Sequence, residues 1–136
     1  MNEQHELSIE LKHWVEKAEH DLRNAEYVLT LKDDCPTDTV CFHAQQCAEK
    51  YLKVLLISRL TDFPKTHDLV LLLNLLGGAE SLGLYLRDIQ PLNRYSVEAR
   101  YPGDWNPIDM DEATRAVTQA QAIRNAVRNL LPANVL

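Results

Sequence analysis

Residues 11–29 read LKHWVEKAEHDLRNAEYVL and place apolar side chains at alternating intervals of four and three residues. This spacing returns to one face of an α-helix, while charged residues cover the opposite face. Residues 113–130 carry a matching pattern with intervals of three and four. We therefore predict two long helices that pack antiparallel at a shallow angle. The two stripes are Leu11, Val15, Ala18, Leu22, Ala25 and Leu29, and Ala113, Ala116, Ala120, Ile123, Val127 and Leu130.

Two more helices are predicted between these segments. One covers residues 37–60, where Thr37 or Asp38 can cap the N-terminus. A shorter helix fits residues 68–76, because Gly77-Gly78 is a strong signal for a helix C-terminus. The face of this short helix is almost wholly apolar, so we expect it to be buried between other helices.

A further helix is expected to begin near residue 81 and to kink or break at Pro91. Residues 102–107, PGDWNP, have the composition of a loop. Asp109 and Glu112 then form a capping box at the start of the last helix. Helical segments without any alternating strand pattern predict an all-α fold, an up-and-down four-helix bundle with an additional short helix.

The 136 residues suit a single domain, and we expect one helical unit over 1–136 with a core from about 8 to 132. No apolar run approaches the length of a membrane span, and the acidic start does not resemble a signal peptide, so a cytoplasmic protein is expected. The formal net charge of −6 argues against a protein that coats nucleic acid. Most of the excess acid falls within residues 1–34, whereas residues 113–136 contain only basic charges (Arg115, Arg124 and Arg128).

The cysteines do not suggest a disulfide framework or a zinc site. Cys35, Cys41 and Cys47 are odd in number and form no C-x-x-C pair. His43 and Cys47 are four residues apart, a spacing that a buried helix face explains without a metal. We predict no metal and no cofactor.

Two polar clusters fall on or beside the predicted middle helices. Gln46, Glu49, Lys50 and Lys53 share one helix face, which is either solvated or part of a half-buried polar network. Residues 65–68, KTHD, begin the next helix. Thr66 or Asp68 would cap it, while Lys65 and His67 beside free N–H groups offer an alternative anion site.

The third cluster, residues 94–105, reads RYSVEARYPGDW and combines two arginines with three aromatic residues. Arg94 and Arg100 could clamp a phosphate, and Tyr101 or its aromatic neighbours could stack on a base. The alternative is that the aromatic residues seal the edge of the bundle and both arginines pair with carboxylates.

Three segments together resemble the HEPN domain family: AQQCAEKYLK at 44–53, THDL at 66–69 and RYP at 100–102. The resemblance extends from about His13 to Leu131. It implies an all-α four-helix core with an extra short helix, commonly dimeric. Such domains are linked with nucleotide binding and are often encoded beside a minimal nucleotidyltransferase. One branch of the family consists of metal-independent ribonucleases, many of them toxins.

The ribonuclease branch carries an arginine and a histidine on its last long helix, often as Arg-Asn-three residues-His with a tyrosine two further on. The matching positions here are Arg124, Asn125, Asn129 and Leu131, so the histidine and the tyrosine are replaced. RNA transesterification needs groups that exchange protons near neutral pH, which an amide does not do. The degenerate motif therefore predicts that the chain is not an efficient ribonuclease.

The resemblance and the clustered cations predict a HEPN-type module that binds a nucleotide or polynucleotide phosphate. Its partners would be a separately encoded minimal nucleotidyltransferase and a second copy of the chain in a homodimer. One alternative is a ribonuclease toxin with a diverged site that uses Arg124, Asn129 and His67. The other is a structural dimerisation module. The candidate ligand-binding residues are Lys50, Lys53, His67, Arg94, Arg100 and Tyr101.

Overall fold

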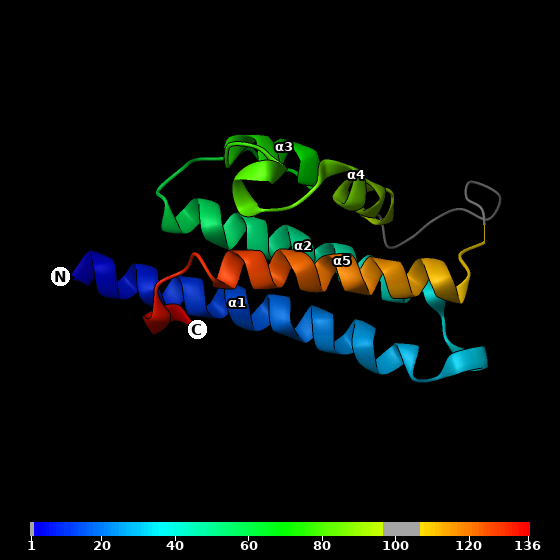
Figure 1. The fold of residues 1–136 in the computed structure, drawn as a ribbon. Coiled ribbons are helices and arrows are strands. Elements are labelled where there is room, and N and C mark those ends of the chain that lie inside the picture. Colours follow the sequence, from blue (N-terminus) through cyan, green and yellow to red (C-terminus); the bar gives the residue numbers. More distant parts are fainter. Residues whose placement is uncertain (1, 97–106) are drawn as a thin grey trace.

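The computed structural model of the chain describes residues 2–96 and 107–136 (Figure 1). Within these two ranges five α-helices are joined by 3₁₀ turns and no strand occurs, which confirms the predicted all-α class. The α-helices are α1 Asn2–Leu29, α2 Thr37–Ser58, α3 Leu69–Leu75, α4 Leu86–Ile89 and α5 Met110–Arg128. The 3₁₀ turns are Lys32–Asp34, Ala79–Leu82, Gln90–Tyr95 and Ala133–Val135. Among the described residues, none of these helices is long and apolar enough to cross a membrane.

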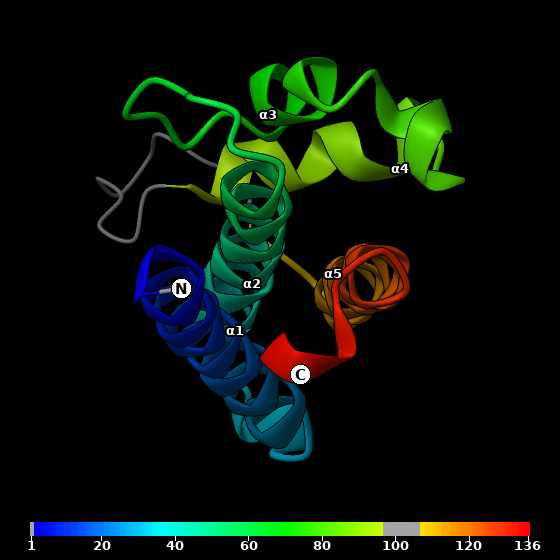
Figure 2. The same cartoon turned by 90° about the vertical axis from the view of Figure 1, so that its left-hand side faces the viewer.

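The three long helices run along one common direction, with α1 antiparallel to both α2 and α5 (Figure 1). Viewed along that direction, α1 and α5 lie beside α2 while the short helices α3 and α4 cover it from a third side (Figure 2). The antiparallel relation of α1 and α5 confirms the prediction, but these two helices contact each other much less than either contacts α2. Each of them packs chiefly against α2.

Helix α2 is central because apolar side chains occur all around it rather than along one stripe. Its apolar residues from 40 to 56 are buried almost without exception. The stripe of α1 is likewise buried from Leu11 to Ala25. The stripe of α5 is buried up to Val127, but Leu130 is 48% exposed because the helix ends at Arg128.

The fourth predicted helix is not continuous. Residues 79–95 form a 3₁₀ turn, the single turn of α4 and a second 3₁₀ turn. Gly83, with φ of 74°, ends the first piece in the left-handed region that glycine adopts readily. Pro91 lies in the first turn of the last piece, where its missing N–H costs no helical hydrogen bond. The break thus begins earlier than the proline alone suggests.

The helix caps follow the sequence at two of three starts, although only the Asp109 half of the predicted capping box at α5 is observed, because the Glu112 carboxylate accepts from Tyr95. The carboxylate of Asp68 accepts hydrogen bonds from the first turn of α3, and that of Asp109 accepts one from the Glu112 N–H at 2.8 Å. The cap at α2 differs, because Thr37 is already helical. Its hydroxyl instead donates to the Ile108 carbonyl at 2.6 Å and ties the start of α2 to the segment before α5.

Leu60 occupies an unfavourable position at the end of α2. Its φ is 53°, and the N–H groups of Leu60 and Thr61 close a Schellman motif on the carbonyls of Ile57 and Leu56. The side chain is 81% exposed, so little packing offsets the strain. Leu60→Gly is expected to raise the free energy of unfolding by about 1 kcal/mol, because glycine adopts this conformation without the Cβ clash. Urea unfolding tests this, with Leu60→Ala as the control that keeps the clash and should show no comparable gain.

Candidate functional site

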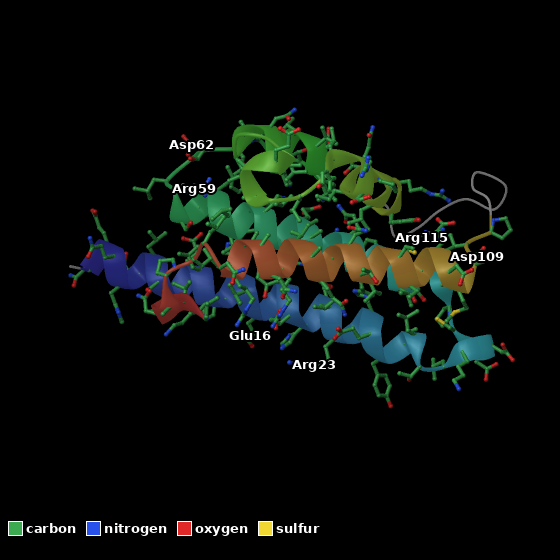
Figure 3. All side chains as sticks on the ribbon, in the orientation of Figure 1. Glu16, Arg23, Arg59, Asp62, Asp109 and Arg115 are labelled. Carbon is green, nitrogen blue, oxygen red and sulfur yellow. The ribbon has the colours of Figure 1, made fainter. Side chains whose placement is uncertain are left out.

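A cleft of about 340 Å³ lies between α5 and the segment formed by α4 and the 3₁₀ turn Gln90–Tyr95. In Figure 3, Arg115 projects from α5 on the side of this segment. The positions 112, 115 and 119 share one face of α5, since residues three and four apart are neighbours on a helix. The lining consists of Arg87, Asp88, Pro91, Leu92, Arg94, Tyr95, Glu112, Arg115, Ala116 and Gln119.

Arg94 is held in place on the wall of the cleft by two neighbours. Its guanidinium lies 3.4 Å from a carboxylate oxygen of Glu112 and 5.3 Å from the centre of the Tyr95 ring. The Tyr95 hydroxyl donates to the same carboxylate. Burial raises the pKa of Tyr95, and the hydrogen bond to Glu112 raises it further. Glu112 therefore neutralises Arg94 and fixes its orientation.

Arg87 and Arg115 lack such a partner. Neither forms an ion pair with a carboxylate in the described part of the chain. Both residues are exposed, and the Arg87 guanidinium lies 5.0 Å from the centre of the Tyr85 ring. Stacking on a ring restricts the arginine, so less conformational entropy is lost when it binds a ligand.

This cleft, called the arginine cleft below, has the chemistry of an anion site. Three arginines face two carboxylates, Asp88 and Glu112, so its lining is positive although the chain is acidic as a whole. Arginine presents a planar fork of N–H donors that fits phosphate or carboxylate oxygens in pairs. A ligand phosphate could therefore accept from Arg87 and Arg115 without displacing Glu112 from Arg94.

Lys50, Lys53 and His67 take part in a different cluster along α2. Lys50 donates to Asp21 of α1 at 2.5 Å, and His43 Nδ1 lies 2.9 Å from the other oxygen of that carboxylate. Lys53 donates to Glu49 at 3.0 Å. These residues do not line the arginine cleft.

Glu49 is the centre of this cluster. Its carboxylate is bonded by Lys53, by His67 Nδ1 at 2.9 Å and by the fully buried Gln45 at 3.2 Å. Gln46 extends the chain by donating to Gln45 at 2.7 Å. Of the two alternatives for this helix face, the half-buried network is the one observed. Its cations already have carboxylate partners, so a ligand would have to break buried ion pairs to use them.

Arg124, the arginine of the degenerate ribonuclease motif, is bound to α1. Its Nε and Nη2 atoms donate to the two oxygens of Glu19 at 2.7 and 3.0 Å. The Tyr51 hydroxyl of α2 also donates to Glu19, and Arg128 donates to that hydroxyl at 3.3 Å. Burial would raise the pKa of Glu19, but the hydrogen bonds from Arg124 and Tyr51 outweigh it and lower that pKa.

The remaining motif positions add no group that titrates near neutral pH. Asn125 is exposed and accepts from Arg124 at 3.1 Å, and Asn129 is the exposed C-cap of α5. The hydrogen bond of the His67 ring leads to Glu49 and not to Arg124. Arg124, Glu19, Tyr51 and Arg128 thus form a clasp between α1, α2 and α5, in which the Arg124 guanidinium is paired with a carboxylate.

The structure brings one candidate from the sequence, Arg94, into the cleft. Arg100 and Tyr101 lie outside the described residues. Sequence reasoning missed Arg87 and Gln119, and it noted Arg115 only as part of a basic helix. The spacing of 112, 115 and 119 on one helix face was a usable signal for the α5 wall, whereas Arg87 had none without the fold.

Comparison with known proteins places the chain in a family. The family model described as HEPN domain matches residues 11–130. The chain is similar to ST0689, described as an archaeal HEPN homologue, with 25% identity, a TM-score of 0.70 and coverage of 88% of this chain and 96% of that one. It is also similar to TT1696 from Thermus thermophilus, with 31% identity, a TM-score of 0.68 and coverage of 89% and 98%.

No curated protein matches the chain in sequence. The match over residues 11–130 covers most of the helical body, from the buried part of α1 through the end of α5. The chain is similar to both structures over nearly their whole lengths. The chain belongs to the HEPN domain family.

Proposed function

We propose that this HEPN domain binds the phosphate of a nucleotide or polynucleotide in the arginine cleft. The observation that carries the proposal is the pair Arg87 and Arg115, which line one cleft and have no carboxylate partner among the described residues. Two exposed arginines that line one cleft without forming an ion pair attract an anion electrostatically. Arg94 adds a third guanidinium, already oriented by Tyr95 and Glu112.

Two further parts of the proposal concern partners. We propose that residues 1–136 act as one unit in a cytoplasmic homodimer, and that a separately encoded minimal nucleotidyltransferase works with it, as the sequence resemblance implies. The homodimer can be checked by sedimentation at micromolar concentration. The partner can be checked by co-purification with the product of a neighbouring nucleotidyltransferase gene, where one exists.

Replacing Arg87 and Arg115 together is expected to abolish most ligand binding. The double variant Arg87→Gln/Arg115→Gln should bind AMP and ATP about 100-fold more weakly than the wild type, because each charge-assisted contact to phosphate contributes about 1.4 kcal/mol or more. Isothermal titration at low salt measures this. The matched control is Arg23→Gln/Arg59→Gln, which removes the same charge from two exposed arginines outside the cleft (Figure 3). Equal losses in the two variants would show that net charge, and not the cleft, determines binding.

The ribonuclease alternative receives less support from the geometry. Arg124 is paired with Glu19, and no histidine hydrogen-bonds to it in the described residues. Incubated with total RNA, the purified protein is expected to leave the RNA intact, because the site lacks a proton acceptor for the 2′-hydroxyl. Gel electrophoresis checks this against Arg124→Ala. Cleavage by the wild type that disappears in Arg124→Ala would establish the ribonuclease and contradict the proposal.

A further inference from the structure

We infer that Glu112 is a built-in competitor of the ligand, and that Arg94 exchanges this carboxylate for the bound anion. The inference rests on the proposed function and adds to it how the affinity of the arginine cleft is regulated. The guanidiniums of Arg87 and Arg115 have no carboxylate partner among the described residues, whereas that of Arg94 is occupied by a carboxylate of the same cleft. The cleft therefore binds an anion more weakly than its three arginines would without Glu112.

The contact between Arg94 and Glu112 is one that an anion can replace. Their nearest nitrogen and oxygen atoms lie 3.4 Å apart, beyond the roughly 2.7–2.9 Å of a charge-assisted hydrogen bond. The side chain of Arg94 is 43% exposed and that of Glu112 is 22% exposed. An ion pair this open to water contributes little free energy, so its replacement by a pair with the ligand costs little. The Tyr95 ring, whose centre is 5.3 Å from the guanidinium, keeps Arg94 at the wall of the cleft during the exchange.

Glu112 keeps other support when Arg94 leaves it. The Tyr95 hydroxyl donates to the same carboxylate oxygen that Arg94 approaches, and Tyr95 is held in place because it is almost completely buried. Glu112 also lies in the first turn of α5, where the helix dipole favours a negative charge. The exchange therefore leaves no carboxylate without a partner.

The inference predicts an effect opposite in sign to that of structural damage. Glu112→Gln removes the negative charge but retains an amide oxygen that can accept from Tyr95. Arg94 is then released for the ligand, so AMP and inorganic phosphate should bind about ten-fold more tightly. The variant also loses an ion pair, so its midpoint of urea unfolding should stay the same or fall. If Glu112 served only to orient Arg94, its replacement would weaken binding.

Asp88→Asn is the matched control, because it removes the same charge from the lining of the same cleft. The Asp88 carboxylate forms no ion pair in the part of the chain that the structure describes, so its loss releases no arginine. At about 0.1 M salt, where exposed charges are screened, it should tighten binding only about two-fold. In an Arg94→Gln background there is likewise no arginine to release, and Glu112→Gln should then also give only about a two-fold gain.

Isothermal titration with AMP and with inorganic phosphate, at one salt concentration, compares the wild type, both single carboxylate variants, Arg94→Gln and Arg94→Gln/Glu112→Gln. A ten-fold gain for Glu112→Gln that shrinks to two-fold in the Arg94→Gln background supports the exchange. Equal gains for Glu112→Gln and Asp88→Asn, or a loss of affinity in Glu112→Gln, would overturn it while leaving the proposed function intact. A wild type that binds neither ligand would overturn the proposed function, and the exchange with it.

Discussion

Glu49→Leu is expected to lower the free energy of unfolding by about 3 kcal/mol, because it leaves the ammonium of Lys53 unpaired in the core. The Lys53 side chain is only 10% exposed, and Glu49 is its carboxylate partner at 3.0 Å. The substitution also removes one of the two acceptors of the buried Gln45 amide, the other being the His67 carbonyl. Urea unfolding followed by circular dichroism measures the loss.

The double variant Glu49→Leu/Lys53→Met provides the control for this prediction. Replacing both partners of a buried ion pair by apolar side chains of similar size is often close to neutral. The double variant should therefore return to within about 1 kcal/mol of the wild type. The inference that Glu49 stabilises the fold by compensating the charge of Lys53 would be contradicted by either of two results. The single variant could be as stable as the wild type, or the double variant could be less stable than the single one.

Glu19→Gln is expected to cost about 2 kcal/mol at neutral pH, since it weakens charge-assisted hydrogen bonds that join α1, α2 and α5. The effect should be smaller than for Glu49, because the side chains of Arg124 and Glu19 are 29% and 25% exposed, so that water competes with their contact. Glu16→Gln is the matched control on the same helix, one turn earlier, where the carboxylate is 61% exposed (Figure 3). Its stability should stay within about 0.5 kcal/mol of the wild type.

The clasp around Glu19 also predicts a pH dependence. The pKa of Glu19 is lowered below the ordinary value of 4.5, so the ionised carboxylate stabilises the folded state fully above that pH. The contribution is lost as the pH falls below 4.5 through the lower folded value. The difference in unfolding free energy between wild type and Glu19→Gln should therefore shrink between about pH 7 and about pH 3. A difference that stays constant, or grows, over this range would contradict the clasp.

The sequence predicted the helices well where one apolar face repeats. The stripe from Leu11 to Ala25 is buried as expected, and the caps at Asp68 and Asp109 are present. It could not predict that α2 is the common partner of α1 and α5. A helix that is apolar on all sides has no single stripe that indicates which helices pack against it. The early break falls at Gly83, a local signal for a helix end that the sequence analysis did not use.

The candidate cations show more clearly why a site is hard to find from spacing. Lys50 and Lys53 looked available on one helix face, but their partners are Asp21, from another helix, and Glu49 on their own helix. Whether a charge is free depends on such contacts, many of which join distant residues. The converse holds for Arg87 and Arg115. They share no sequence motif, and they line one cleft only because the segment containing α4 packs beside α5.

The most direct test of the arginine cleft is an NMR titration of isotope-labelled protein with AMP. The backbone amide shifts are expected to change in residues 86–95 and 112–119, the two walls of the cleft, and to saturate with one binding constant. Arg87→Gln/Arg115→Gln should remove these changes at the same nucleotide concentration. Shift changes concentrated instead in residues 19–27 and 121–128, along the seam of α1 and α5 that contains Arg124, would contradict the account.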